Sequence, residues 1–266
     1  VVNAFNQVQS SLRWFVDNYS RIADWRATLR RVESLHEALA SLDRPNGVEG
    51  HIDCIEDATD GVQFTDFELK LPAGSTGFPD GRLAIERGDR VQIVGETGAG
   101  KSTLFLAMAG LWSKGRGSIR HPPRERMMFL PERPYFPLGR LTEALAYPDG
   151  SDRFAREAYE LALRTLGLDR LVGSLDEAER WDKSLTLDEQ QMLAFARMWL
   201  HRPDWVVMDD AMSALGARPR QCIFALMTAM PGLSVIALTR TADTDVFFER
   251  TVRLERRNGE RRRGRR

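Results

Sequence analysis

The chain has 266 residues, of which 42% are hydrophobic, so it is long and apolar enough to bury the core of one large domain. Its 38 Lys and Arg balance its 38 Asp and Glu, and a net charge of zero supplies no global field for binding nucleic acid. Two cysteines far apart, Cys54 and Cys222, have no metal or redox spacing, and we expect reduced thiols in a cytosolic compartment. No signal peptide and no run of roughly 20 apolar residues is present. The first residue is Val rather than Met, which indicates a fragment of a longer protein, with removal of a Met by processing as the alternative.

Residues 1 to about 41 are predicted to form one long helix. Apolar residues recur there at spacings of three, four or seven, and no Gly or Pro occurs before Pro45. The stripe consists of Phe5, Val8, Leu12, Phe15, Tyr19, Ile22, Leu29, Val32, Leu35 and Leu39, widened by Trp14 and Trp25. Such a helix can pack on its own domain or form a short coiled coil. The segment "DRPNGVEG" then ends the helix and is typical of a linker.

From about Gly50 onward, short buried strands alternate with helices. Strands are predicted in "VQFTDFELKLP", "GDRVQIVG", "RMMFLP", "DWVVMDD", "LSVIALT" and "TVRLE". Helices are predicted in "KSTLFLAMAGLW" and throughout Leu141 to Leu200, including "DRFAREAYELALRTLGL" and "LDEQQMLAFARMWL". This alternation predicts an α/β fold with a parallel sheet and a helical insertion.

The chain ends in a basic segment, "RLERRNGERRRGRR", with eight Arg among fourteen residues. We expect a solvated tail at about 256–266. The alternative is attraction to an anionic membrane surface, at roughly 1 kcal/mol per nearby basic residue.

A phosphate-binding loop is predicted between a strand and a helix. "GETGAGKST" fits G-x-x-x-x-G-K-[ST], and its glycines allow backbone N–H groups to surround a phosphate. Lys101 is expected to reach the β- and γ-phosphates and Ser102 to ligate Mg²⁺. A Gly-rich turn of no function is the alternative, but it rarely occurs between a strand and a helix. The candidate cofactor-binding residues are Gly95, Glu96, Thr97, Gly98, Ala99, Gly100, Lys101, Ser102 and Thr103.

Two aspartates end the buried run "WVVMDD" downstream of this loop. A carboxylate at the end of such a strand can hold magnesium in P-loop enzymes, so Asp209 is the candidate metal residue together with Ser102. Asp210 is then the adjacent carboxylate, placed to face an attacking water.

Four segments together resemble the nucleotide-binding domain of ABC transporters over about residues 60 to 256. They are "GETGAGKST", "FLPERPYFPLGRLTEALAYP", "LTLDEQQMLAFAR" and "VVMDDAMSAL". The second is similar to bacterial relatives of the peroxisomal fatty-acyl exporters, a group that includes peptide and cobalamin importers. The resemblance implies a P-loop NTPase core with a helical subdomain at about 131–200 and an antiparallel β edge. It also implies that 1–43 extends a last transmembrane helix and that the nucleotide-binding domain covers 44–266.

The resemblance further implies a cytoplasmic domain on the bacterial inner membrane that binds ATP and Mg²⁺. Its partners would be a transmembrane domain, in the same polypeptide or in another subunit, and a second nucleotide-binding domain. That second domain would form a head-to-tail homodimer or heterodimer, and nucleic acid is not an expected partner. Each ATP would lie between one P-loop and the signature segment of the other domain, which here contains Thr186 and Asp188.

Several family positions carry other residues here. Glu132 occupies the position of the family's Q-loop glutamine and could still bind the metal. Asp210 occupies the position of the catalytic glutamate and is shorter by one methylene, about 1.5 Å of reach. The switch histidine aligns with Thr239, next to Arg240. Thr239, Asp210 and Glu132 are therefore the candidate catalytic residues of a weakened site.

The signature segment and the adenine site also depart from the family. Asp188 replaces a glycine, and its charge near a phosphate at ~4 Å would cost about 4 kcal/mol per pair at an effective dielectric near 20. The same segment reads as a capping box, Thr186-x-x-Glu189, that begins a helix. Gly216 replaces an aspartate that makes a contact across the dimer. Near Leu71 the usual stacking aromatic is missing, and Phe78 is the substitute candidate.

The leading interpretation is thus an ABC transporter ATPase with degenerate motifs and slow hydrolysis. The first alternative is a nucleotide-binding pseudoenzyme that clamps on ATP without turnover. The second is a soluble ABC ATPase of DNA repair or translation, against which the long N-terminal helix argues.

Overall fold

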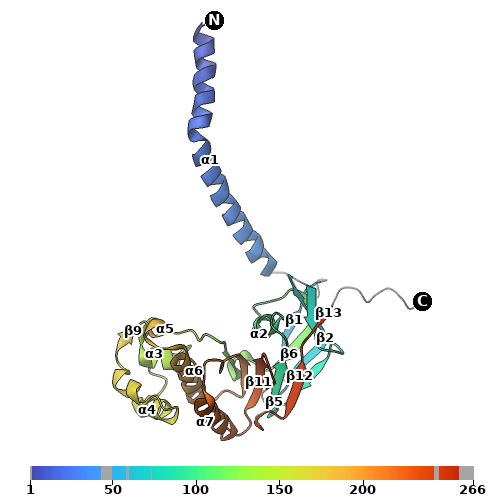
Figure 1. Cartoon of the computed structure of the whole chain (residues 1–266), viewed down its shortest axis with the longest axis vertical. Helices are drawn as coiled ribbons and strands as arrows, with labels where there is room; N and C mark the ends of the chain where they lie inside the picture. The colour runs from blue at the N-terminus through green and yellow to red at the C-terminus, as the bar shows by residue number, and fades with distance from the viewer. Residues whose placement is uncertain (1, 43–49, 58–59, 73, 243–245, 258–266) are drawn as a thin grey trace, which may run out of the picture. The chain divides into compact units, whose positions relative to one another are not determined.

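The computed structural model describes residues 2–42, 50–57, 60–72, 74–242 and 246–257, although the side chains at both ends of the first helix lie outside this description (Figure 1). The chain divides into two compact units, Val1–Val48 and Glu49–Arg266, which we describe separately. The predicted boundary at residues 43 and 44 lies outside the described residues. The first two residues of the predicted tail at about 256–266, Arg256 and Arg257, instead belong to the strand Glu255–Arg257 (β13), which pairs with Gly74–Gly77 (β3), and the rest of the tail, 258–266, lies outside the described residues.

The first unit is the helix α1, Val2–Leu42, as its apolar spacing predicts. Of the predicted stripe, Trp14, Tyr19, Ile22, Trp25, Leu29, Val32 and Leu35 are all exposed on this helix. The stripe residues Phe5, Val8, Leu12, Phe15 and Leu39 lie outside the described side chains. None of the helices in the described residues combines the length and the apolar character that are required to span a bilayer.

The centre of the second unit is a parallel sheet with the order β12-β5-β11-β10-β7. These strands are Arg250–Arg253, Arg90–Val94, Ser234–Thr239, Trp205–Asp209 and Met127–Leu130. The three inner strands are almost entirely buried, as expected of a sheet covered on both faces, and their buried residues are apolar apart from Gln92 and Ser234. The predicted parallel core is therefore confirmed.

A second sheet, mainly antiparallel, supplies the predicted β edge. Its path is β1-β6-β2-β3-β13, and β4 pairs with β2. The strands are β1 Asp53–Glu56, β2 Val62–Leu71, β3 Gly74–Gly77, β4 Leu83–Ile85, β6 Gly115–His121 and β13 Glu255–Arg257. β2 alternates between buried and exposed side chains until a register shift near Asp66, whose φ is 49°.

The remaining elements are mainly helices. α2 (Lys101–Met108) follows β5, and α7 (Ala217–Thr228) follows β10. The helical subdomain contains α3 Leu141–Ala146, α4 Arg156–Thr165, η2 Asp169–Ser174, α5 Trp181–Ser184 and α6 Leu187–His201. The short 3₁₀ helix η1 is Arg124–Arg126. In Figure 1 the subdomain helices gather at the opposite end of this unit from β1, β2 and β13.

The helical subdomain differs from its prediction in two ways. α4 begins at Arg156 rather than Asp152, because residues 149–153 form a turn in which the Arg153 N–H donates to the Gly150 carbonyl. Two short strands, β8 Gly139–Arg140 and β9 Ala178–Glu179, pair across the subdomain although no strand was predicted there. Two-residue strands have no periodicity that could reveal them in the sequence.

Candidate functional site

The predicted phosphate loop lies where the buried strand β5 passes into α2. Gly98 and Gly100 have φ values of 79° and 93°, which side chains disfavour. A Cβ at Gly100 would approach the side chains of Leu71 and Thr76 to 2.9 Å. The loop therefore depends on glycine for its conformation and for its packing against the second sheet.

Lys101 is enclosed by the loop that precedes it. Its side chain is 7% exposed, and its Nζ donates to the carbonyl oxygens of Gly95 at 2.6 Å and Glu96 at 3.1 Å. The ammonium group is therefore held at the mouth of the loop, and its third proton remains available for an anion.

Ser102 and Asp209 meet beside Lys101. The Ser102 hydroxyl donates to the Asp209 carboxylate, although the two residues belong to different elements. Burial raises the pKa of Asp209, the charges of Asp210 and Glu132 raise it further, and Lys101 and the Ser102 hydrogen bond oppose the rise. The structure thus brings together the predicted metal residues Ser102, Asp209 and Glu132.

Asp210 lies at the start of a tight turn beyond β10. Its φ is 46°, its N–H donates to the Leu238 carbonyl, and its carbonyl accepts from the Ser213 N–H. Its carboxylate forms an ion pair with Arg240, with 3.2 Å between Arg240 Nε and Asp210 Oδ2. The candidate base therefore already has a cationic partner.

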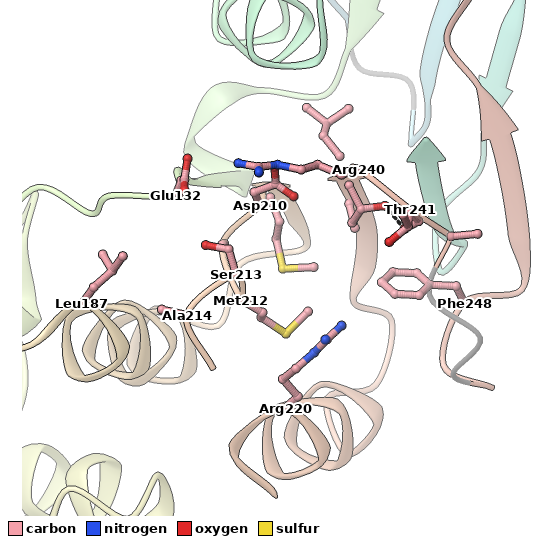
Figure 2. A pocket seen from close by; sticks show the side chains of 16 residues that line it. Glu132, Leu187, Asp210, Met212, Ser213, Ala214, Arg220, Arg240, Thr241 and Phe248 are labelled. Carbon is pink, nitrogen blue, oxygen red and sulfur yellow. Dashed lines mark hydrogen bonds and ion pairs between the residues drawn. The ribbon is translucent and has the colours of Figure 1, made fainter. Parts of the chain in front are cut away.

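A cavity of about 610 Å³ opens beside this pair. In Figure 2, Glu132 and Leu187 lie at one end of it and Thr241 and Phe248 at the other, with Asp210 and Arg240 between them. Thr239 also lines the cavity, but its hydroxyl donates to the Thr241 carbonyl at 3.0 Å. The candidate catalytic residues Asp210, Thr239 and Glu132 therefore share one cavity.

The signature segment begins α6 through the predicted capping box. The Thr186 N–H and hydroxyl donate to Glu189 Oε2 at 3.1 and 2.9 Å, and Arg170 also binds the Glu189 carboxylate. These contacts lower the pKa of Glu189 against the opposing effect of its burial. Thr186 and Asp188 are exposed, whereas Leu187 between them lines the cavity. Within this chain, Thr186 and Asp188 therefore do not join the P-loop.

One sequence-based candidate is wrong. Phe78 is only 1% exposed. Its ring packs edge-on against Phe64 and stacks on Phe67 at an interplanar angle of 30°, with ring centroids 5.0 and 5.9 Å away. Its ring belongs to the core under the second sheet and offers no face to an adenine base.

The sequence reasoning also missed two polar side chains. Gln191 in α6 is fully buried and contacts the segments that contain Glu132 and Ser213. Arg256 in β13 donates to the Gly98 carbonyl at 3.0 Å and so contacts the P-loop from the C-terminal end of the chain. No local pattern marks either residue, because each contact joins distant parts of the chain.

A strand–loop–helix with an enclosed lysine, a serine at the helix start and an aspartate at a neighbouring strand end defines a P-loop nucleotide-binding domain. The family described as ABC transporter matches residues 79–213. The chain therefore belongs to the ABC transporter family and is the ATP-binding domain of such a transporter, as the resemblance of its motifs indicated.

Individual relatives agree with this assignment. An uncharacterized ABC transporter ATP-binding protein from Synechocystis is 31% identical over 85% of this chain and 35% of its own length. The ABC transporter D family member 1 of Arabidopsis thaliana is 29% identical, over 74% of this chain and 16% of its length. Human ATP-binding cassette sub-family D member 3 is 30% identical over 58% of this chain and 25% of its own length. The chain thus spans about a third or less of these relatives.

A solved structure has the same fold. A bacterial Atm1-family ABC exporter with ATP bound superposes with a TM-score of 0.61 at 21% identity, over 81% of this chain and 40% of that chain. At this identity the match supports the fold alone, and it confirms the predicted α/β architecture.

Proposed function

We propose that this chain binds MgATP in the P-loop and couples binding and slow hydrolysis of ATP to transport of a substrate across a membrane. The observation that carries the proposal is the assembly of Lys101, Ser102 and Asp209 at the junction of β5, α2 and β10. An enclosed ammonium group, a hydroxyl and a carboxylate are the groups that a triphosphate and its metal require.

The residues present fit a magnesium ion. Ser102 and Asp209 offer oxygen ligands, with Glu132 close enough to affect the Asp209 charge, and Mg²⁺ prefers few protein oxygens completed by phosphate and water. No group of three or more His, Cys, Asp or Glu in the described part of the chain could hold a metal alone, so the site would need the nucleotide. A cation held there would offset the repulsion of the Asp209 carboxylate by the negative charges of Asp210 and Glu132. With Ser102 and Asp209 holding it, the ion would supply charge neutralisation for the phosphates.

Slow turnover follows from the groups around Asp210. A general base must approach its water to roughly 2.6–3.2 Å, and aspartate is shorter than glutamate by one methylene. The cation that faces Asp210 is Arg240, while the Thr239 hydroxyl is engaged by Thr241. Asp210 would accept the proton of the attacking water only after its carboxylate moves away from Arg240.

The proposal includes partners that complete the site. A second nucleotide-binding domain would place its Thr186 and Asp188, or their equivalents, against the nucleotide, since both are exposed at the start of α6. A transmembrane domain would be joined to α1 or supplied by another subunit. The expected location is the cytoplasmic face of a bacterial inner membrane.

One observation favours a second candidate function, a clamp that binds ATP without turning it over. The Asp210 carboxylate already contacts Arg240, with 3.2 Å between Arg240 Nε and Asp210 Oδ2, so an attacking water would have to compete with Arg240 for this oxygen. In this case ATP would close two domains on each other and serve a structural or regulatory role.

Titration of the protein with labelled ATP, with and without Mg²⁺, tests the proposal. Asp209→Ala should abolish the magnesium-dependent part of the affinity while weak binding through Lys101 remains. Asp204→Ala is the matched control, because this carboxylate pairs with Arg126 and Arg87. Equal magnesium dependence in Asp209→Ala and in the unmodified protein would contradict the proposal.

A further inference from the structure

A buried amide in α6 connects three segments around the proposed catalytic groups. Gln191 has no exposed surface, and its side-chain nitrogen and oxygen both have partners. Its Nε2 donates to the Glu132 carbonyl at 2.9 Å and to Ser213 Oγ at 3.2 Å, and its Oε1 accepts from the Ala214 N–H at 3.1 Å. One side chain thus links α6 to the segment after β7 and to the turn after β10.

Both linked segments carry a carboxylate of the proposed site. β7 and β10 are parallel neighbours in which Leu130 pairs with Met208, and Glu132 and Asp210 each follow two residues later. The Ser213 N–H donates to the Asp210 carbonyl, so a displacement of Ser213 also displaces the turn that contains Asp210. Gln191 therefore holds the backbone of Glu132 directly and that of Asp210 through one further hydrogen bond.

The other end of this connection is the exposed start of α6. Gln191 lies one helical turn beyond Leu187 and Asp188, and the Gln190 N–H donates to the Thr186 carbonyl. A helix turn is rigid on this scale, so any displacement of the Thr186–Asp188 end is passed to Gln191. A contact that moves the start of α6 would therefore also move Glu132 and Asp210.

We propose that Gln191 is a positioning residue that couples the start of α6 to the two carboxylate-bearing segments of the nucleotide site. The inference rests on the proposed function, since it assumes that Glu132 and Asp210 act on bound MgATP. Gln191 acts through these two segments rather than on the nucleotide itself. The three hydrogen bonds of its amide tie the position of α6 to the positions of the segments that contain Glu132 and Asp210.

The neighbouring Gln190 provides a matched control. Its Nε2 also donates twice, to the Asp182 carbonyl at 3.0 Å and the Leu185 carbonyl at 2.9 Å, but both partners precede α6 in the same subdomain. Gln190→Met and Gln191→Met each remove an amide from the same helix at nearly constant volume. Only Gln191→Met frees the segments that contain Glu132 and Asp210.

The experiment compares Gln191→Met, Gln190→Met and the unmodified protein in the intact chain. The measurements are ATP affinity, the Mg²⁺ concentration for half-maximal ATP binding, and phosphate release per bound ATP. For Gln191→Met we expect ATP affinity without Mg²⁺ within twofold of the unmodified protein. The half-maximal Mg²⁺ concentration should rise at least threefold, and any phosphate release should fall at least tenfold at unchanged KM. Gln190→Met should stay within twofold on all three measurements.

If Gln191→Met does not fold, Ser213→Ala replaces it in the experiment. This change removes only the 3.2 Å hydrogen bond between Gln191 Nε2 and Ser213 Oγ, and it should raise the half-maximal Mg²⁺ concentration about twofold. The inference is overturned if Gln191→Met and Gln190→Met, or Ser213→Ala and the unmodified protein, have equal Mg²⁺ dependence. Failure of the proposed function is a different result, because the unmodified protein would then show no Mg²⁺-dependent ATP binding at all. The Ala214 amide still tests the link in that case: its hydrogen exchange should accelerate at least tenfold in Gln191→Met, and unchanged exchange would refute it.

Discussion

Replacing Lys101 by Ala removes the ammonium group that the P-loop encloses. In the structure this group makes two hydrogen bonds to the loop, at 2.6 and 3.1 Å, and it is almost fully buried. A hydrogen bond between a charged donor and a phosphate is worth about 1.5–3 kcal/mol. At 1.4 kcal/mol per tenfold change in affinity, losing one γ-phosphate contact should weaken ATP binding about 10- to 150-fold.

The lower part of that range is the better expectation, because Lys101 already has two partners and gains less from a third. The assay is direct titration with labelled ATP, since the Lys101→Ala change also leaves two loop carbonyls without a donor and will alter the melting temperature by itself. AMP should be affected much less than ATP, because it lacks the β- and γ-phosphates that Lys101 is expected to reach. Lys114→Ala is the control, since that lysine lies beside Trp112, outside the loop. If Lys101→Ala binds ATP as tightly as the Lys114→Ala variant, the assignment of the loop is wrong.

Three further predictions concern stability. Burial raises the pKa of Asp209 above 3.8, so folding takes up a proton between that value and the raised one, and stability falls as pH rises through this window. Asp209→Asn should therefore raise the melting temperature of the nucleotide-free protein at pH 7, with no gain below pH 3.8; a loss of melting temperature at pH 7 would count against this. Burial lowers the pKa of Arg197 to about 10, and the residue donates to the carbonyls of Tyr135 and Ala144. Arg197→Met should lower the free energy of unfolding, measured in urea, by about 2 kcal/mol. An unchanged free energy of unfolding would mean that water replaces the guanidinium as the donor to these carbonyls. Deleting residues 1–42 should leave the melting temperature of the second unit nearly unchanged, and a large drop would show that α1 belongs to its core.

The sequence predicted those parts of the fold that depend on local pattern. Strands such as β5, β10 and β11 are short, mainly apolar segments, and the P-loop is a contiguous motif, so local sequence was sufficient to recognise them. The capping box at Thr186 and Glu189 is equally local, and the structure contains it.

The remaining features depend on contacts between distant residues. Gln191 meets partners 59, 22 and 23 positions away, and Arg240 meets Asp210 across 30 positions. Phe78 looked available because it lies near Leu71 in the sequence, yet the fold turns its ring into the core against Phe64. The direction of the Phe78 side chain is decided by packing under the second sheet, which no short pattern encodes.

Steady-state phosphate release from the intact protein tests the central claim, that Asp210 is a weakened base beside a working MgATP site. The unmodified protein should release phosphate slowly, and Asp210→Ala should reduce the rate at least tenfold. Asp210→Glu alone should raise it only modestly, whereas adding Thr239→His and Asp188→Gly should raise it far more than the single changes together, because base, switch and signature act as one unit. Rapid release that Asp210→Ala leaves unchanged would contradict the account.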